Sequence, residues 1–193
     1  MNIVEPIRNK QDIKRIENFL LKQNLRDLLF FLIGINCGLR ISDILNLDVG
    51  DVKNKTHINI IEKKTKKYKR FPLNKKLKPM LDKFTFGRDK EEPLFLTKNN
   101  NRLERTQCYR ILNDVCKKVG IDYKVGTHTL RKTFGYHHYQ KFKDVAILQK
   151  IFNHSSQEVT LRYIGIDQDM IDESFKILFF KLNFIRNLIT KLN

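Results

Sequence analysis

The sequence predicts a mainly α-helical domain with a small antiparallel β-sheet, an α+β fold. Apolar residues recur at helical spacing through most of the 193 residues. One stretch, residues 57–73, instead carries β-forming residues on both sides of a charged run. A chain of this length can bury one hydrophobic core, and no internal repeat or Gly/Ser-rich linker divides it. We therefore expect a single domain over residues 1–193.

Three predicted helices open the chain. The first begins between Asn9 and Asp12, where apolar residues start to recur on one helix face. The second is more apolar and runs from about Leu25 to Asn36, and Gly38 marks its end or a sharp bend. Two further segments follow: a short helix over residues 41–47 and a turn over residues 48–51.

The middle of the chain predicts a β-hairpin. Residues 57–61 (HINII) and 69–73 (KRFPL) are rich in β-forming residues and are separated by the almost wholly basic run EKKTKKY. Residues 94–97 (LFLT) are a candidate third short strand. Helices are expected on either side of that strand, over residues 75–84 and 104–119.

The second half of the chain returns to helices. One runs from Thr127, as its N-cap, to about Lys141, and the next begins at its cap Asp144 and ends at Phe152. Ser155 or Ser156 caps a third helix, which extends through Tyr163. Apolar residues continue at helical spacing over residues 170–192.

The charge balance points to a polyanionic partner. The chain has 38 Lys and Arg against 21 Asp and Glu, a formal net charge of +17. Such a field attracts DNA, because each neutralised phosphate releases a condensed counterion. An anionic membrane surface ranks second, and a basic surface that only keeps the protein in solution is the plainest alternative. Double-stranded DNA is the partner that we expect.

Cysteine content and the N-terminal sequence bear on the compartment. Cys37, Cys108 and Cys116 are odd in number and form no CxxC pair, which favours free thiols over a disulfide framework or a zinc site. The N-terminal residues lack the apolar core of a secretion signal, and no apolar run is long enough to cross a membrane. We expect a cytoplasmic, nucleoid-associated protein with no membrane contact and no bound metal.

Two segments carry arginine in a setting suited to a phosphate. His128 and Arg131 in HTLR share one helix face, where a guanidinium grips phosphate through two donors and an imidazole relays a proton. Arg40 in CGLRISDIL lies among apolar neighbours at a helix start, and Asp43 is placed to orient it. A surface pair and a structural salt bridge are the respective alternatives.

Lysine, histidine and tyrosine complete the set of reactive side chains. A lysine of the EKKTKKY run can protonate a leaving alkoxide, although most of these lysines would only coat DNA or face water. His154 ends one predicted helix, and Tyr163 follows nine residues later. A tyrosine becomes a nucleophile when cations stabilise its phenolate or a base removes its proton. Core packing is the alternative for Tyr163, and also for the YHHY cluster of residues 136–139.

The order of these residues resembles the tyrosine recombinase family of the phage-integrase type. The resemblance covers about Leu25 to Ile164 and is carried by GLRISDILNL, HTLRKTF and HSSQEVTLRY. Lys64 precedes Thr65 in KTKKYKRFPL, which matches the family's hairpin lysine pattern, and Lys63 and Lys66 stay open as alternatives. Matched by motif, the catalytic set is Arg40, Lys64, His128, Arg131, His154 and Tyr163, with Asp43 in support and with Lys63, Lys66, Lys67, Lys69 and Lys132 as DNA contacts.

The resemblance implies the tyrosine recombinase catalytic-domain fold and type IB chemistry without metal, cofactor or ATP. Tyr163 would attack the scissile phosphate, form a 3′-phosphotyrosyl link and release a 5′-hydroxyl, which rejoining reverses. Arg40, Arg131 and His154 would stabilise the phosphorane, while Lys64 would protonate the leaving oxygen and His128 would assist proton transfer. Two rivals are a type IB topoisomerase-like enzyme and a DNA-binding module without activity. The DNA site and the outcome, whether integration, excision, inversion or resolution, stay open.

The chain departs from the family pattern at two places. The third box commonly reads Leu-Gly-His but here reads Phe152-Asn153-His154, and asparagine tolerates the left-handed backbone of that turn. Residues 1–24 are expected to be a helix or linker remnant with no N-terminal core-binding domain, so the chain is either naturally short or a catalytic fragment. Residues 170–193 are expected to dock on a neighbouring protomer and to build a homo-oligomer, a tetramer, on DNA.

Overall fold

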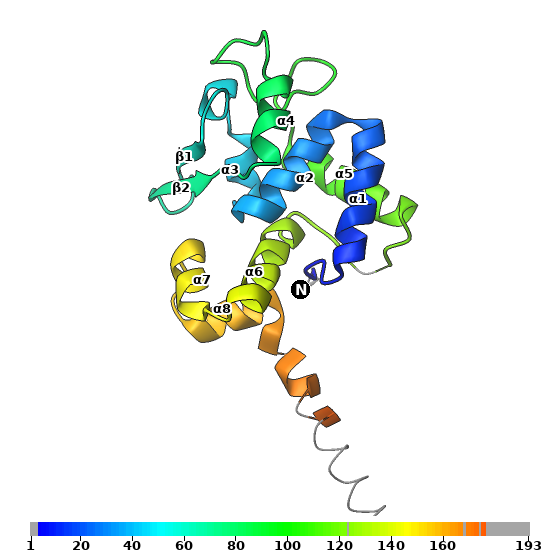
Figure 1. Cartoon of the computed structure of the whole chain (residues 1–193), viewed down its shortest axis with the longest axis vertical. Helices are drawn as coiled ribbons and strands as arrows, with labels where there is room; N and C mark the ends of the chain where they lie inside the picture. The colour runs from blue at the N-terminus through cyan, green and yellow to red at the C-terminus, as the bar shows by residue number, and fades with distance from the viewer. Residues whose placement is uncertain (1–3, 123, 168, 174, 177–193) are drawn as a thin grey trace, which may run out of the picture.

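The computed structural model describes residues 4–122, 124–167, 169–173 and 175–176, and it is mainly helical. The expected hairpin is present, with strands β1 (His57–Ile61) and β2 (Tyr68–Pro72). Figure 1 shows the first five helices and the hairpin on one side of the molecule, with the last three helices gathered on the other. These helices are α1 (Lys10–Gln23), α2 (Leu25–Cys37), α3 (Ile41–Leu45), α4 (Leu77–Phe84), α5 (Arg105–Lys118), α6 (Thr129–Phe142), α7 (Val145–Phe152) and α8 (Gln157–Ile164), with the 3-10 helix η1 (Val49–Asp51) after α3.

Helix α2 is the centre of the larger of two hydrophobic cores. Seven of its residues, from Leu28 to Gly34, are buried in succession, because α1, α4 and α6 all pack against it. Asn24 caps its first turn, accepting a hydrogen bond from the backbone N–H of Arg26. Gly38 ends it in the left-handed conformation (φ 62°), as expected, and a Cβ there would lie 2.4 Å from the Phe134 ring.

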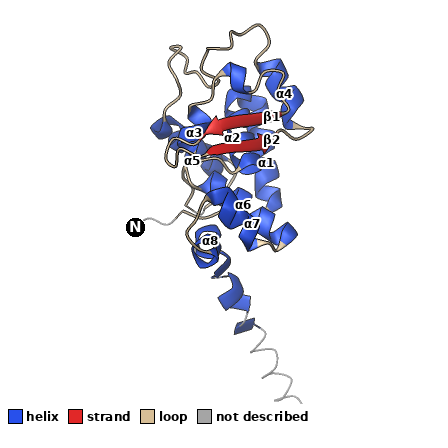
Figure 2. Cartoon of the chain, turned by 90° about the vertical axis from the view of Figure 1, so that its left-hand side faces the viewer, coloured by secondary structure: helices blue, strands red, loops and turns tan. Residues whose placement is uncertain are grey.

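The two strands pair in antiparallel register, from His57 opposite Pro72 to Ile61 opposite Tyr68, and Figure 2 shows them side by side. The third strand predicted over residues 94–97 is wrong. Around that segment the described chain forms only isolated bridges, between Asp48 and Pro93 and between Leu96 and Arg102. The backbone N–H and C=O groups of this short apolar run form hydrogen bonds with loop residues instead of a strand ladder.

Helices α6, α7 and α8 enclose a second, much smaller core. Its buried members are Leu148, Phe152, Ile164 and Ile166. Gly135 lets α6 approach them closely, since a Cβ at this position would lie 2.5 Å from Ile164 and 2.7 Å from Phe152. The nucleophile predicted from the sequence, on α8, therefore belongs to a packing unit separate from that of α2.

Two of the three predicted caps in this half are confirmed. Asp144 accepts a hydrogen bond from Ile147 N–H, and Ser156 accepts one from Val159 N–H. The prediction for Thr127 is wrong, because the residue preceding α6 is His128 and no side chain caps it. The Thr129 hydroxyl instead accepts from the backbone of Gly126, which makes a local turn in place of a cap.

Two further expectations concern the ends and the cysteines. The apolar segment predicted over 170–192 lies largely outside the described residues. Among those that are described, no helix is long and apolar enough to cross a bilayer. Cys37, Cys108 and Cys116 are free and buried, and burial raises their thiol pKa values.

Candidate active site

Arg131 joins the two cores. Its side chain is buried, with 3% of the residue exposed, and its Nη1 donates to Gly38 O at 2.6 Å while its Nη2 donates to Phe152 O at 3.0 Å. The guanidinium carbon also lies 4.4 Å from the centre of the Phe152 ring. One planar cation therefore connects the end of α2 with the end of α7, which fixes its position.

Tyr163 faces this cation from α8. Its hydroxyl lies 3.4 Å from His128 Nδ1, and its ring packs edge-on against His154 with 5.0 Å between centroids. Lys132 Nζ lies 5.4 Å from the centre of the Tyr163 ring. Burial raises the pKa of Tyr163, and the positive charges of Arg131 and Arg40 oppose that shift. The phenol is thus neutral at rest and is placed where cations would stabilise its anion.

The two histidines beside Tyr163 are held in the neutral form. Burial and then the positive charges of Arg131 and Arg40 lower the pKa of His154 to about 4. Burial and then the nearby Arg105 and other cations lower the pKa of His128. A neutral His128 can accept the phenol proton at Nδ1.

A hydrogen bond fixes the tautomer of His154. Its Nδ1 lies 3.1 Å from the Thr160 hydroxyl, which itself donates to Ser156 O at 3.0 Å. Because the hydroxyl proton is used there, His154 Nδ1 is the donor, and Nε2 of the neutral ring carries no proton. His154 can therefore donate from Nε2 to a phosphate oxygen only after a bound phosphate has raised its pKa.

Arg40 begins α3, as expected, but its main partner differs from the expected one. Arg40 Nη1 donates to Glu62 Oε1 at 2.6 Å, while Asp43 Oδ2 is 4.0 Å from the same nitrogen. Asp43 Oδ1 instead accepts from the backbone N–H of Lys63 at 3.0 Å. Asp43 thus orients the start of the hairpin loop, and Glu62 orients the arginine.

The hairpin lysines fall into two groups. Lys63, Lys64 and Lys66 are exposed, and the structure gives the Lys64 ammonium no hydrogen bond or ion pair with any described residue. Lys67 Nζ donates to Asn153 Oδ1, and the half-buried Lys69 donates to Lys150 O at 2.9 Å. The first group is free to meet a phosphate, whereas Lys67 and Lys69 tie the hairpin to the end of α7.

Sequence reasoning missed Glu62 and Thr160. Because Glu62 opens a run of lysines, the run was interpreted as a basic hairpin connection with one catalytic lysine, and the carboxylate was given no role. The alternation of side chains along the strand predicts that Glu62 is buried, because Ile58 and Ile60 point inward and the next inward position is 62. Thr160 follows Ser156 by one helical turn, which places its hydroxyl on the face toward His154.

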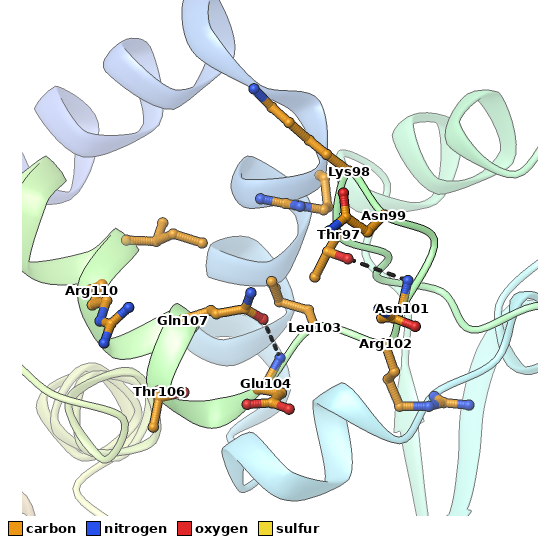
Figure 3. Close-up of a pocket in the computed structure, with 12 residues that line it drawn as sticks. Thr97, Lys98, Asn99, Asn101, Arg102, Leu103, Glu104, Thr106, Gln107 and Arg110 are labelled. Atoms are coloured by element: carbon orange, nitrogen blue, oxygen red, sulfur yellow. Dashed lines mark hydrogen bonds between the residues drawn. The ribbon is translucent and has the colours of Figure 1, made fainter.

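A separate hollow of about 750 Å³ lies between α5 and the loop that precedes it. Its wall includes Lys98 and Arg110, and Figure 3 shows the hydrogen bonds of Asn101 N–H to Thr97 and of Glu104 N–H to Gln107. None of the six predicted catalytic residues lines it. The described part of the chain also contains no group of three or more His, Cys, Asp or Glu side chains placed to hold a metal.

Comparison with known proteins agrees with this geometry. The profile of the Phage integrase family matches residues 8–170. The chain is 46% identical over 178 residues to the probable integrase/recombinase YoeC of Bacillus subtilis (strain 168), covering 92% of this chain and 98% of YoeC.

Solved structures show the same fold. The XerA recombinase superposes with a TM-score of 0.73 at 22% identity, over 90% of this chain and 65% of that protein. The XerH site-specific recombinase, bound to a palindromic difH substrate in a post-cleavage complex, superposes with a TM-score of 0.71 at 21% identity, over 92% of this chain and 54% of that protein. The chain thus spans about half to two thirds of these two proteins. The family profile over residues 8–170 and the 46% identity to YoeC show that the chain belongs to the phage integrase family of tyrosine recombinases.

Proposed function

We propose that the chain cleaves and rejoins double-stranded DNA with Tyr163 as its nucleophile. The observation that carries this is the position of the phenol, 3.4 Å from His128 Nδ1, against the ring of His154 and near the buried Arg131. A net charge of +17 favours DNA as the substrate, and the structurally similar XerH was solved bound to its DNA substrate.

The first chemical step forms one bond and breaks one. Tyr163 Oη attacks the scissile phosphorus while its proton passes to neutral His128, so the Tyr163–phosphorus bond forms as the bond to the 5′ oxygen breaks. Lys64 gives its proton to that leaving oxygen, which departs as a 5′-hydroxyl. Attack by a 5′-hydroxyl on the phosphotyrosine reverses the step, so no high-energy cofactor is consumed.

Three groups are proposed to stabilise the phosphorane. Arg131 and Arg40 provide guanidinium donors for the non-bridging oxygens, and each is fixed by a carbonyl or a carboxylate on its other side. His154 becomes a donor once the phosphate anion has raised its pKa. The five predicted contacts are proposed to hold the DNA backbone: Lys63, Lys66, Lys67, Lys69 and Lys132.

Assembly and location follow as further parts of the proposal. Residues 1–193 would act as one catalytic domain, and residues 170–193 would dock on a neighbouring protomer to build a tetramer on DNA at the nucleoid. Truncation after Asp172 tests this by the size of the protein–DNA complex. The tetramer should be lost, and an unchanged complex would show that the segment is not needed.

A nicked suicide substrate tests the nucleophile. Once the short 5′ end diffuses away, the cleaved strand stays on the enzyme and migrates as a covalent adduct. The wild type should form the adduct and Tyr163→Phe should not, whereas Tyr139→Phe, a matched change in the same small core, should keep it. An adduct that persists in Tyr163→Phe would overturn the assignment.

A further inference from the structure

Glu62 is a fully buried carboxylate at the junction of the hairpin and the arginine site. Its residue is 0% exposed. Oε1 accepts from Arg40 Nη1 at 2.6 Å, and Oε2 accepts from the Thr65 hydroxyl at 2.6 Å. Each carboxylate oxygen thus binds one of two elements that are 25 positions apart in sequence, α3 and the hairpin loop.

The backbone of Glu62 closes the same loop. Its N–H donates to Lys67 O at 2.9 Å, and its carbonyl accepts from Lys66 N–H at 2.9 Å, where Lys66 is left-handed at φ 56°. Lys64 lies within this closed turn. Any movement of the Glu62 side chain would therefore move Arg40 and the loop of Lys64 together.

Glu62, like the buried Asp43, is a negative charge among several buried or half-buried cations. Burial lowers the pKa of Lys69, and Glu62 is the charge that most opposes this change. Burial likewise lowers the pKa of Arg131, and the positive charge of Arg40 lowers it as well. Tyr163 and Glu62 have the opposite effect and raise this pKa. Burying a carboxylate is costly without such partners, so the position of Glu62 is tightly determined.

The guanidinium of Arg40 is left free to bind a second anion. Glu62 uses one of its five N–H donors, and Asp43 at 4.0 Å makes no hydrogen bond with it. A planar group held at one edge presents its other donors in a fixed direction. Arg40 also lies near enough to Tyr163 for its positive charge to lower the pKa of the phenol.

We propose that Glu62 is a positioning residue for strand cleavage, which sets Arg40 and the Lys64 loop in one arrangement before DNA binds. The inference rests on the proposed function, because it assigns Glu62 to the same reaction. Glu62 touches neither the phosphate nor the nucleophile. It acts on the reaction through Arg40 on one oxygen and through Thr65 on the other.

The first test compares cleavage with DNA binding at equal folding. In Glu62→Gln, single-turnover cleavage at saturating DNA should fall about 10- to 100-fold, because a misplaced guanidinium stabilises the phosphorane poorly. The affinity for the same duplex should be unchanged or higher, because a negative charge has been removed. Glu62→Met, of similar size but without hydrogen bonds, should lose more. The melting temperature of each variant identifies any that fail to fold.

Glu17→Gln is the matched control. Glu17 lies on α1, pairs with the exposed Lys76 at 2.6 Å and is outside the site, so this change removes an ion pair of the same length. Its cleavage rate should equal that of the wild type. The comparison separates the loss of a surface ion pair from the loss of a positioning group.

The second test separates the contact of Glu62 with Arg40 from its contact with Thr65. Replacing the bridging 5′ oxygen by sulfur gives a leaving thiolate that needs no proton, so the contribution of Lys64 disappears. Thr65→Val removes only the hydrogen bond between Glu62 and the hairpin loop. On the sulfur substrate this variant should cleave at the wild-type rate, although it is slow on the oxygen substrate. Glu62→Gln should stay slow, because Arg40 is still unanchored.

Two outcomes would overturn the inference. One is a folded Glu62→Gln that cleaves the oxygen substrate as fast as Glu17→Gln. The other is a parallel loss of cleavage and of DNA affinity, which would indicate a structural role alone. If the wild type forms no covalent adduct with either substrate, the proposed function fails instead, and the role of Glu62 fails with it.

Discussion

The two cores of the molecule differ in size and in what they hold. The larger one surrounds α2 and supports Arg40 and, through Ile58, the hairpin with Lys64. The smaller one has four fully buried apolar members and supports His154 and Tyr163. Arg40 and Lys64 thus depend on the larger core, while His154 and the proposed nucleophile belong to a unit with four buried apolar members.

This difference indicates how the site can be both ordered and able to change. Phosphorane stabilisation requires donors that do not rearrange during the reaction, which a large core provides. A nucleophile that must attack, remain bonded and leave again benefits from a helix that moves as a small unit. Arg131 and the Lys67 and Lys69 contacts connect the two units, together with the packing of α6 on α2.

Removing the bridge between the cores should have the largest effect. Arg131→Lys keeps the charge but cannot donate to both Gly38 O and Phe152 O, so one buried carbonyl loses its partner. We expect cleavage to fall by about 10²- to 10³-fold and the unfolding free energy to fall by about 1–3 kcal/mol. Single-turnover cleavage and denaturant unfolding measure the two losses. Cleavage within tenfold of the wild type would show that the bridge does not matter.

A matched pair of truncations should separate the two cores. Leu81 in the larger core and Leu148 in the smaller one are both fully buried. Leu81→Ala should lower the free energy of global unfolding by about 2–5 kcal/mol and leave cleavage by the folded protein unchanged. Leu148→Ala should lower global stability less but slow cleavage, because the cavity lies under α7 and α8. Equal effects of both changes on cleavage would remove the distinction.

How much of this could be predicted from the sequence depends on the range of the interaction. Helical periodicity located α2 and α8, and the caps Asp144 and Ser156 were predictable because a cap bonds three residues ahead. The partner of Arg40 could not be predicted in this way. Asp43 is near it in sequence, whereas Glu62 lies 22 positions later and is brought to Arg40 by the hairpin. Local spacing favours the nearer carboxylate, and only tertiary packing selects the buried one.

The lysines show the same limit. Lys67 and Lys69 were expected to contact DNA with the rest of the basic run, and that prediction stays a prediction. Their contacts with Asn153 and with the carbonyl end of α7, more than 80 positions away, were not predicted. Composition can predict that a run is basic. It cannot predict which ammonium groups a neighbouring helix end will engage.

The hairpin contact with α7 should give a smaller effect than the truncations. Lys69→Met removes the donor to Lys150 O and Ile151 O, two carbonyls in the last turn of α7. We expect the unfolding free energy to fall by about 1 kcal/mol, and the exposed Lys63→Met should leave it unchanged. Urea unfolding of the two variants decides this. No difference between them would mean that Lys69 does not join the units.

Acid should weaken the small unit first. In the folded protein the pKa of His154 is about 4, below its ordinary value of 6.5. Between these two pH values His154 is therefore protonated in the unfolded chain and neutral in the folded one. Stability should therefore be complete above pH 6.5 and decrease toward pH 4. His154→Gln should remove about 1 kcal/mol of that decrease, a value reduced for the partial solvent exposure of the ring. An unchanged pH slope in this variant would contradict the assignment.

Native-state hydrogen exchange tests the division into two units most directly. Backbone amides of α2 should exchange only through global unfolding, whereas those of α8 should open at least about tenfold more often, a difference of about 1.4 kcal/mol in opening free energy. If the amides of α8 are protected as strongly as those of α2, then Tyr163 belongs to the same rigid body as the arginines. The account of a nucleophile on a separately moving unit would then be wrong.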